Sequence, residues 1–400
     1  MGWNSSDNND LATVPALYRM AQRSILQADF YLWLDIVDDN LLEMLNKNFT
    51  NVKIVTGDID EDGQPTTEEL KNILSETALF FYTSGGAHRV DWSGNGDNGI
   101  ETRSLQYCLD NGISYAIIGL GQIPEQQDQL DAFVKITNGA EFVYSTSTAT
   151  DKALKEKNLK ISKLQNSPNL LFAFDLRNDT DSRNVLQQFN LIDRDFLTVD
   201  FNTAGLPKEK LEEYAQKVSE IINTWVEKTE KHVLILPNSI NDVEFSISKI
   251  YDALEPDIKS KVSIAKEKFM PDLAASIYEK SRIISGMSLF PVCSGVKSGN
   301  PVMFLSTTDI SASAKTIADM GLKNSIQDIH SKSGEELSEV LLEINDKYLD
   351  GIIESDKARE YAMKKLQFQF DDFNRFVNKK TNQNTNSKDK TKKKKNKQVE

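Results

Sequence analysis

The chain is poor in cysteine and histidine, with two of the first and three of the second among 400 residues. Two cysteines, Cys108 and Cys293, cannot build a disulfide framework, and three histidines are too few for a histidine-rich metal site. No apolar run approaches the roughly 18 residues of a membrane-spanning helix, and no charged-then-apolar leader follows Met1. From these absences we predict a cytoplasmic protein that has neither a transmembrane segment nor a metal site.

Positive charge is scarce outside the C-terminal end. The formal net charge is −13; residues 378–400 hold nine lysines against Asp389 and Glu400, so this segment carries +7 and residues 1–377 carry −20. An acidic body argues against nucleic-acid binding by the folded part. Because the lysine- and asparagine-rich segment 378–400 cannot bury enough apolar surface to order itself, we predict a disordered tail there.

Length and pattern predict two domains. A chain of 400 residues with 39% hydrophobic content can bury a sizeable core and exceeds the usual size of one domain. Strands alternate with helices throughout, which favours an α/β fold with parallel sheets. We predict two Rossmann-like domains, residues 1–190 and 191–377, that face each other across a cleft. The phenylalanine-rich helix 356–377 is predicted to pack across the domain junction.

The expected strands follow an amphipathic helix that begins after a polar loop containing Gly2 and Asp10. Segment 30–37 fits a strand or a helix equally well, so its structure stays open at this point. The other apolar runs predict strands at 52–58, 78–84, 114–121, 141–147 and 170–176, and in the second domain at 195–202, 232–238, 262–267, 281–286 and 301–306.

The acidic loop Asp58–Glu69 has the spacing of a calcium-binding loop, because its first and last residues stand at the first and twelfth positions of an EF-hand. A predicted strand, however, precedes the loop where an EF-hand has a helix, and Pro65 occupies a position usually held by an aliphatic residue. We therefore expect no calcium binding. The alternative is an acidic strand-to-helix loop in which Thr66 caps the following helix.

Two glycines, Gly85 and Gly86, end the predicted strand 78–84 and open a long glycine-rich loop. Glycine after a strand lets a ligand approach the backbone closely, so both are candidate substrate-binding positions. His88 and Arg89 follow as a pair at the carboxyl end of this strand, and we predict them as catalytic residues. The alternative is a loop in which neither side chain has a chemical role.

Residues 269–322 read as a unit of two helices and two strands. A helix starts at Pro271, where a missing N–H is tolerated, and leads into the strand 281–286. A second helical run leads into the strand 301–306. Two short apolar strands joined by such a crossover form a parallel pair, and ligands of parallel sheets bind at the carboxyl ends of the strands. The turn at Gly286 is therefore a predicted ligand site, with Gly286 and Ser288 as substrate-binding positions.

In this stretch, the order PDLA, IISGMSLF, GNPV and MGL resembles the polysaccharide pyruvyl transferase family. The resemblance implies a GT-B fold and transfer of a pyruvyl group from phosphoenolpyruvate, as donor substrate, to a hydroxyl of a carbohydrate acceptor, with no further cofactor. Segment Arg177–Ser182 resembles the family's R-x-D-x-E segment, which implies that Arg177 contacts phosphate. The resemblance also implies a strand that leads into the loop at Gly2; it would precede Met1, or else the edge of the sheet is abbreviated.

Two chemical residues of the family are replaced in this chain. The family motif G-M-R-L-H reads GMSLF, so Ser288 and Phe290 stand in place of the arginine and the histidine. Transfer from phosphoenolpyruvate requires cations that hold the phosphate and an acid that protonates the methylene carbon. Ser288 offers only a hydroxyl, and Phe290 cannot carry a proton.

Three functions remain open on the sequence. The first is pyruvyl transfer with relocated charges, using His88, Arg89 and Arg177. The second is a catalytically degenerate family member that binds a sugar or nucleotide as an interaction module. The third is a GT-B glycosyltransferase that shares only the architecture.

Overall fold

A computed structural model of the chain describes residues 7–26, 28–34, 39–50, 52–83, 99–121, 123–124, 126–204, 206–307 and 311–396. Up to residue 190 its elements are α1 (Asn8–Ser24), β1 (Tyr31–Leu34), α2 (Asp39–Asn48), β2 (Lys53–Thr56), α3 (Glu68–Glu76), β3 (Phe80–Thr83), α4 (Gly99–Asp110), β4 (Tyr115–Leu120), α5 (Gln127–Gly139), β5 (Phe142–Ser145), α6 (Thr148–Glu156), β6 (Leu164–Asn166), the 3-10 helix η1 (Leu170–Ala173) and α7 (Asp179–Gln188).

The remaining elements are β7 (Phe196–Asp200), the 3-10 helix η2 (Lys208–Lys210), α8 (Leu211–Thr229), β8 (His232–Ile235), α9 (Ile240–Phe245), the π-helix η3 (Ser246–Tyr251), α10 (Pro256–Lys259), β9 (Val262–Ile264), α11 (Pro271–Lys280), β10 (Ile283–Gly286), α12 (Leu289–Lys297), β11 (Val302–Ser306), α13 (Ala312–Asp319), the 3-10 helix η4 (Lys323–Ser325), β12 (Ile326–Asp328), α14 (Gly334–Asp346) and α15 (Tyr348–Asn396).

Three sheets form the framework, and all their strand pairs among the described residues are parallel. The second half of the chain forms one sheet in the order β12-β11-β10-β7-β8-β9, and the first half forms a pair, β1-β2, and a sheet β3-β4-β5-β6. The α/β class with two Rossmann-like halves is confirmed. The predicted parallel pairing of strands 281–286 and 301–306 is also confirmed, because Ile284 of β10 lies opposite Val302 of β11.

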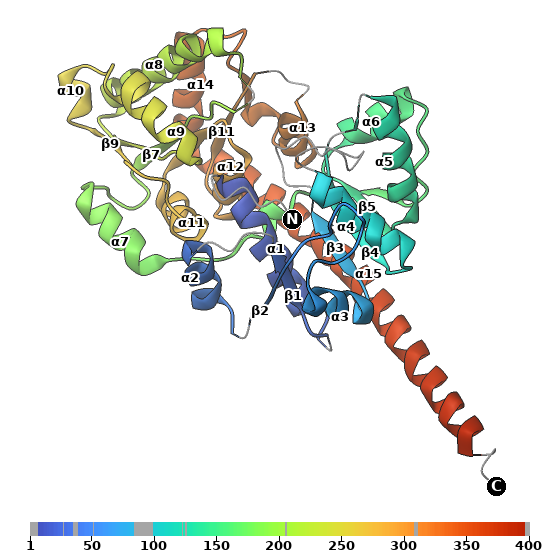
Figure 1. Cartoon of the computed structure of the whole chain (residues 1–400). Coiled ribbons are helices and arrows are strands. Elements are labelled where there is room, and N and C mark those ends of the chain that lie inside the picture. The colour runs from blue at the N-terminus through green and yellow to red at the C-terminus, as the bar shows by residue number, and fades with distance from the viewer. Residues whose placement is uncertain are drawn as a thin grey trace.

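The six-stranded sheet places alternate side chains in two apolar cores. Leu197 of β7 and Ile283 of β10 face α8 and α14, where Trp225 is fully buried. The adjacent residues in these strands, Phe196 before Leu197 and Ile284 after Ile283, face the opposite way. They join a core that includes α1, α11, α12 and α15. Both faces of the sheet are therefore covered by helices, which is the usual condition of parallel strands. Figure 1 shows α8 and α14 together on the outer side of this half.

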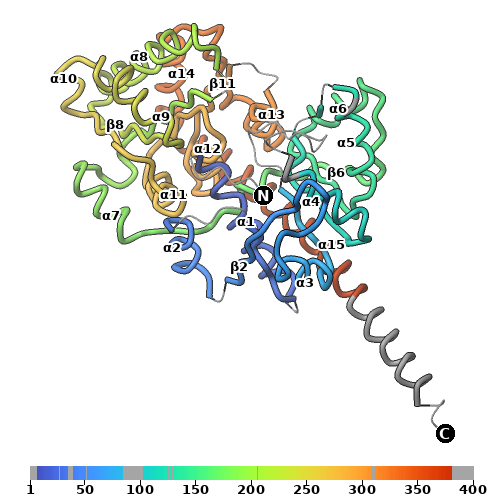
Figure 2. Tube along the Cα trace, in the orientation of Figure 1, coloured from blue at the N-terminus to red at the C-terminus, as the bar shows by residue number. Residues whose placement is uncertain are grey.

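Helix α15 connects the two halves, as the sequence predicts. Near its start, the Ser355 hydroxyl donates to the backbone oxygen of Asn300 at 2.7 Å. Farther along, the ring of Phe373 lies 5.0 Å from the rings of both Phe81 and Phe142, so the helix packs on the sheet of the first half. Figures 1 and 2 show α15 passing from one half to the other. The division between residues 190 and 191 and the disordered tail at 378–400 stay predictions.

One predicted strand of the first half is wrong. Residues 170–176 form no strand; Leu170–Ala173 make the 3-10 turn η1, which packs against α1, α12 and α15. The turn is capped by Asn169, whose side-chain oxygen accepts a hydrogen bond from the backbone N–H of Leu171 at 2.9 Å. A short apolar run fits a buried helical turn as well as a buried strand, and here the capping side chain decides between them.

The structure decides the segment that the sequence left open and the cap of α3. The segment left open at 30–37 forms strand β1 over Tyr31–Leu34. In the acidic loop, Thr67 rather than Thr66 caps α3, with its hydroxyl accepting from the N–H of Leu70 at 3.2 Å. Thr66 is engaged inside the loop, where its hydroxyl accepts from the N–H of Asp58 at 2.8 Å.

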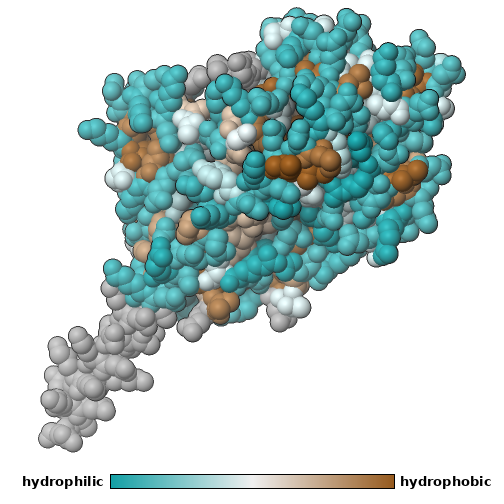
Figure 3. All heavy atoms as spheres, turned by 180° about the vertical axis from the view of Figure 1, so that it is seen from behind, coloured by the Kyte–Doolittle hydropathy of each residue, from teal (hydrophilic) through white to brown (hydrophobic). Residues whose placement is uncertain are grey.

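The face of the molecule that lies behind in the view of Figure 1 is mainly hydrophilic. Figure 3 shows this face as teal with separate small hydrophobic patches. Exposed large apolar side chains are scattered along the chain at Leu26, Tyr31, Ile192, Ile240, Leu349, Ile353, Tyr361 and Phe368. None of the helices in the described residues combines the length and the apolarity needed to cross a membrane.

We expect Phe373→Ala to destabilise the protein strongly, by about 3–5 kcal/mol, because it removes a fully buried ring and leaves a cavity between α15 and the first sheet. Phe368→Ala is the matched control on the same helix, since that ring is 57% exposed. Denaturant unfolding followed by circular dichroism measures both. Equal midpoints for the two variants would contradict the packing of α15 on this sheet.

Candidate functional site

The strand order of the six-stranded sheet reverses between β7 and β10. The chain adds β8 and β9 on one side of β7 and then returns to add β10, β11 and β12 on the other side. In open α/β sheets, ligands bind outside the carboxyl ends of the strands at such a switch point. Gly286 ends β10 and lies opposite Asp200, which ends β7. The predicted turn is therefore at the switch point.

Asp200 fixes the loops on both sides of this point. It is fully buried, and one carboxylate oxygen accepts from the N–H of Asn238 at 3.2 Å while the other accepts from the N–H of Ser288 at 2.9 Å. A Cβ atom on Gly286 would lie 3.2 Å from the Cβ of Asp200, which is tighter than most such contacts. A side chain at position 286 would therefore need Asp200 to shift by a few tenths of an ångström.

The first turn of α1, from the first half of the chain, contacts the loops that follow β8 and β10. Asp7 caps α1, and its Oδ1 accepts from the N–H of Asn9 at 2.7 Å and from the side chain of Asn238 at 3.1 Å. The side-chain oxygen of Asn9 accepts from the N–H of Phe290 at 2.8 Å. The side chain of Asn8 donates to the backbone oxygen of Phe269 at 3.0 Å. We call these residues, Asp7, Asn8, Asn9, Asp200, Asn238 and Ser288, the switch-point cluster.

Burial makes the carboxyl groups of this cluster hard to ionise. Desolvation raises the pKa of Asp200 to about 7, and the nearby carboxyls of Asp242 and Asp7 add to the effect. Desolvation also raises the pKa of Asp7 to about 6, with the neighbouring Asp10 contributing. The pKa of Asp242 is raised by its burial too, although Thr203 donates two hydrogen bonds to it. The cluster is acidic, so it does not attract an anion by charge.

Two N–H groups at the start of α12 are already engaged in this structure. The N–H of Ser288 donates to Asp200, and the N–H of Phe290 donates to Asn9. The side chains of Ser288 and Phe290 are almost completely buried. The helix dipole still favours negative charge here, and the Asp200 carboxyl already occupies that position. An anion at the turn would have to displace Asp200 or Asn9. The substrate-binding roles of Gly286 and Ser288 stay predictions.

The side chain of Arg177 reaches the last turn of α11, whereas the next residue, Asn178, lines the pocket described below. Its Nε donates to Glu279 at 2.8 Å, and Nη1 donates to the backbone oxygen of Leu176 at 2.8 Å. Glu279 is in the last turn of α11, whereas Asp272 is in its first turn. None of the described hydrogen bonds joins Arg177 to the turn at Gly286, and its role as a phosphate contact stays a prediction.

The other predicted site residues stand apart from this cluster. Gly85, Gly86, His88 and Arg89 lie outside the described residues, so the structure does not place them. The loop Asp58–Glu69 is described and connects β2 to α3 as a strand-to-helix loop. In the part of the chain that the structure describes, no group of three or more His, Cys, Asp or Glu side chains is arranged to hold a metal ion. Calcium binding by this loop is untested.

A pocket of about 760 Å³ lies beside the switch-point cluster, between the two halves of the chain. We call it the interdomain pocket. Segment 266–270, which follows β9, and the start of α9, which follows β8, form one side, and α1 and α2 form the other. The pocket touches the cluster through Phe269, whose backbone oxygen accepts from Asn8. It is lined by Leu11, Asn40, Glu43, Met44, Lys47, Asn178, Asp181, Ile240, Val243, Glu244, Lys266, Glu267, Lys268, Phe269, Met270, Asp272 and Leu273.

The sequence carries signals for some of the cluster residues that the predictions missed. Asp200 stands near the carboxyl end of the predicted strand 195–202, which is the edge where ligands bind. Asp7 and Asn9 lie in the segment that the sequence pattern predicts as a polar loop before the first helix. Nothing in the sequence indicates that these side chains meet, because they are about 190 residues apart.

Two parallel-stranded α/β halves with a pocket between them at the carboxyl ends of the strands define the GT-B fold, and the chain has that fold. S. aureus MnaA in complex with UDP matches with a TM-score of 0.58 at 9% identity, over 88% of each chain. UDP-GlcNAc 2-epimerase from Neisseria meningitidis bound to UDP-GlcNAc matches with 0.57 at 11% identity, over 90% of this chain and 95% of its own. The O. sativa protein Os79 in complex with UDP matches with 0.55 at 10% identity, over 92% and 97%.

No protein-family model and no curated protein matches the chain. At these identities the solved structures establish the fold alone. The pyruvyl transferase resemblance therefore stays a prediction, whereas the GT-B architecture that it implies is confirmed.

The raised pKa values of Asp200 and Asp7 predict that the protein becomes more stable as the pH falls from 7 to 5. A folded-state pKa of about 7 for Asp200, above the ordinary 3.8, means that the folded state binds this proton more tightly than the unfolded state. The penalty for burying the charge is fully present above pH 7 and disappears as the pH falls toward 4. One pKa unit corresponds to about 1.4 kcal/mol, so the gain is on the order of a few kcal/mol.

Asp200→Asn tests the source of this pH dependence. The variant is expected to be less stable than wild type, because its amide nitrogen cannot accept one of the two hydrogen bonds that Asp200 accepts. Its stability profile between pH 7 and 5 is expected to be flatter. Asp346→Asn, at an exposed position, is the control and should keep the wild-type slope. Urea unfolding at several pH values measures this, and an unchanged slope in Asp200→Asn would contradict the assignment.

Proposed function

We propose that the chain binds a nucleoside diphosphate sugar in the interdomain pocket and acts as a GT-B glycosyltransferase. The observation that carries this proposal is the position of the pocket, which both halves line at the carboxyl ends of β8 and β9. Ligands of parallel sheets bind at this edge. Its volume of about 760 Å³ is within the range typical of small-molecule sites. The neighbours MnaA and the Neisseria epimerase hold UDP and UDP-GlcNAc, which supports this ligand class.

The side chains at the pocket supply the contacts that such a ligand needs. Lys47, Lys266 and Lys268 are the cations of its lining and offer charge-assisted hydrogen bonds to phosphate oxygens. The half-buried ring of Phe269 offers a flat apolar surface on which a base can stack. Asn178 and several carboxylates offer acceptors for ribose and sugar hydroxyls. The excess of carboxylates over lysines favours the hydroxyl-rich part of the ligand and weakens binding of a bare anion.

Binding without turnover is the second candidate, and one observation favours it. The N–H groups of Ser288 and Phe290, which face the switch point, donate to side chains of the chain itself. A transferase needs donors that meet the charge developing on the leaving diphosphate, and two such donors are already used here. In that case the chain is a sugar- or nucleotide-binding module with a GT-B fold. Release of UDP from UDP-GlcNAc in the presence of sugar acceptors separates the two functions.

We expect calorimetric titration to show UDP binding that Lys266→Glu weakens by about tenfold or more. A lost charge-assisted hydrogen bond costs about 1.5–3 kcal/mol, and each 1.4 kcal/mol is tenfold in affinity. Lys208→Glu is the matched control, because Lys208 is an exposed lysine that does not line the pocket. The control should bind UDP as wild type does.

Two results would contradict the proposed ligand. One is the absence of UDP binding to the wild-type chain at millimolar concentration, and the other is an equal effect of Lys266→Glu and Lys208→Glu. Pyruvyl transfer, which the sequence resemblance implies, is measured separately as phosphate release from phosphoenolpyruvate.

A further inference from the structure

Helix α15 carries a row of apolar side chains on its outer side. The row consists of Leu349, Ile353, Tyr361 and Phe368, which are 72%, 51%, 46% and 57% exposed. At 3.6 residues per turn, their positions fall within about one third of the helix circumference, so they share one side of the helix. The row is about 28 Å long, because each residue of a helix adds about 1.5 Å. We call it the outer stripe.

The inner side of α15 has its partners within the chain. Ala358, Ala362 and Leu366 are buried and belong to the apolar core that α1, α11 and α12 also enter. Isolated apolar side chains are normal on a protein surface and need no partner. Four of them along one side of a helix are instead typical of a helix that packs against another helix. The exposure of the outer stripe shows that no described element of the chain covers it.

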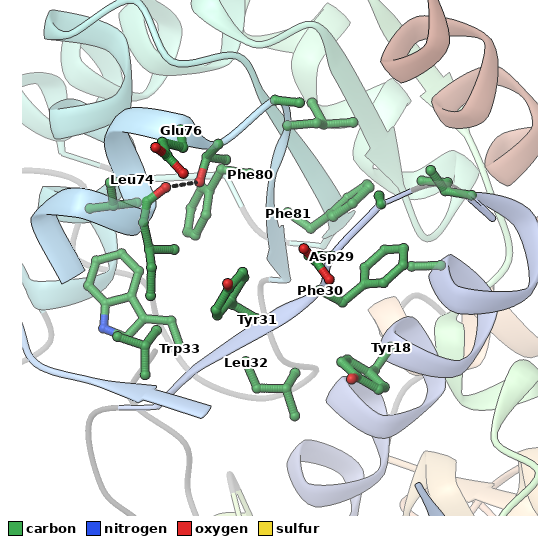
Figure 4. A pocket seen from close by; sticks show the side chains of 18 of the residues that line it. Tyr18, Asp29, Phe30, Tyr31, Leu32, Trp33, Leu74, Glu76, Phe80 and Phe81 are labelled. Atoms are coloured by element: carbon green, nitrogen blue, oxygen red, sulfur yellow. Dashed lines mark hydrogen bonds between the residues drawn. The ribbon is translucent and has the colours of Figure 1, made fainter. Parts of the chain in front are cut away.

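The apolar cavity in the first half of the chain is a different kind of surface. It has a volume of about 390 Å³ and lies between β1 and β3. Figure 4 shows aromatic side chains of both strands around it, with Tyr18 of α1 and Leu74 of α3 on either side. Because a helix with its side chains is about 10–12 Å wide, a cavity of this size cannot take up a helix of another chain. The outer stripe lies on the surface, where a second chain can reach it.

Charged side chains of both signs accompany the outer stripe. In chain order they are Glu354, Lys357, Glu360 and Lys364, and all four are exposed. Among the described residues, the salt bridges within α15 involve none of these four side chains. Their signs alternate along the helix, so the four charges cancel. They therefore favour a partner whose charges follow a matching order, rather than a partner of one net sign.

This order of charges matches a second copy of α15 that runs antiparallel to the first. In such a pair Leu349 lies opposite Phe368 of the second copy, and Lys357 lies opposite Glu360 of the second copy. Both contacts are centred between residues 358 and 359, so one register makes both of them. In a parallel pair, by contrast, Lys357 would face Lys357. Like charges that face each other repel, so the antiparallel orientation is favoured.

The same register adds a second charged contact. It places Ile353 opposite Lys364 of the second copy, where the apolar stem of the lysine can cover the isoleucine. The next residue, Glu354, is then within reach of the lysine ammonium group. Because a two-fold axis repeats every contact, each pair of opposite charges occurs twice in the complex.

We propose that the outer stripe is an interface between two copies of this chain, in which the two α15 helices pack antiparallel around a two-fold axis. This surface is separate from the interdomain pocket, whose lining contains no residue of α15. One helix face on each side makes an interface smaller than the roughly 800 Å² per partner of a standard complex. We therefore expect a reversible dimer with a dissociation constant of about micromolar, and a monomer in dilute solution.

Charge substitutions at the central contact test the orientation. Lys357→Glu places glutamates opposite each other, and Glu360→Lys places lysines opposite each other. We expect each variant alone to raise the dissociation constant of the dimer by about tenfold or more. An equimolar mixture of the two variants has opposite charges at both central contacts, so it should form a mixed dimer as readily as wild type does. Sedimentation equilibrium of the full chain measures this, with a limiting mass of twice 45.1 kDa.

An apolar position gives a second readout that does not depend on charge pairing. Leu349→Glu buries a carboxylate against Phe368 of the second copy, so we expect this variant to stay monomeric. Leu26→Glu is the matched control, because Leu26 is 82% exposed and lies outside α15. The control should dimerise as wild type does. Both variants should keep the wild-type circular dichroism spectrum, since both side chains are exposed.

Three results would overturn the proposal. The first is a wild-type chain that stays monomeric well above micromolar concentration. The second is a wild-type dimer that Leu349→Glu leaves intact, because the interface then lies elsewhere on the molecule. The third concerns the charge variants: if each dimerises as wild type does, or if their mixture stays monomeric, the antiparallel register is wrong.

Discussion

The arrangement of the two halves depends on one buried polar contact, in which the first turn of α1 binds the carboxyl ends of β7, β8 and β10. Asp200 holds the loops after β8 and β10 together, and Asp7 and Asn9 attach α1 to the same loops. Buried carboxylates are costly unless they are hydrogen-bonded or protonated. Asp7 and Asp200 each accept hydrogen bonds from more than one N–H group, and burial raises the pKa of each. The contact therefore specifies how the halves meet, and its strength varies with pH.

This contact also limits what the switch point can bind. The N–H groups at the start of a helix are in general available to an anion such as a diphosphate. Here the N–H groups of Ser288 and Phe290 already donate to the chain's own side chains. The interdomain pocket beside the cluster keeps its volume and its lysines. Under the proposed function, these two features favour a ligand that is held mainly through its base and sugar, with α1 fixed by Asn8 at the edge of the pocket.

The described strands of the first half of the chain belong to two sheets with an apolar cavity between them, and helix α15 packs on this half. The ring of Phe373 packs on the rings of Phe81, Phe142 and Tyr144 in the sheet β3-β4-β5-β6.

The sequence by itself determined the class of fold, because alternating apolar strands and amphipathic helices leave few other ways to bury both faces of a parallel sheet. It also located the turn at Gly286, since a glycine that ends a buried strand is a local signal. It did not decide 170–176, where an apolar run without a period fits a strand or a helical turn, and where the cap from Asn169 decides.

Only the tertiary structure brought Asp7, Asn9 and Asp200 together, because their contact depends on how two sheets pack and leaves no pattern along the chain. The same holds for the cavity between β1 and β3, which exists only once the order of the strands is known.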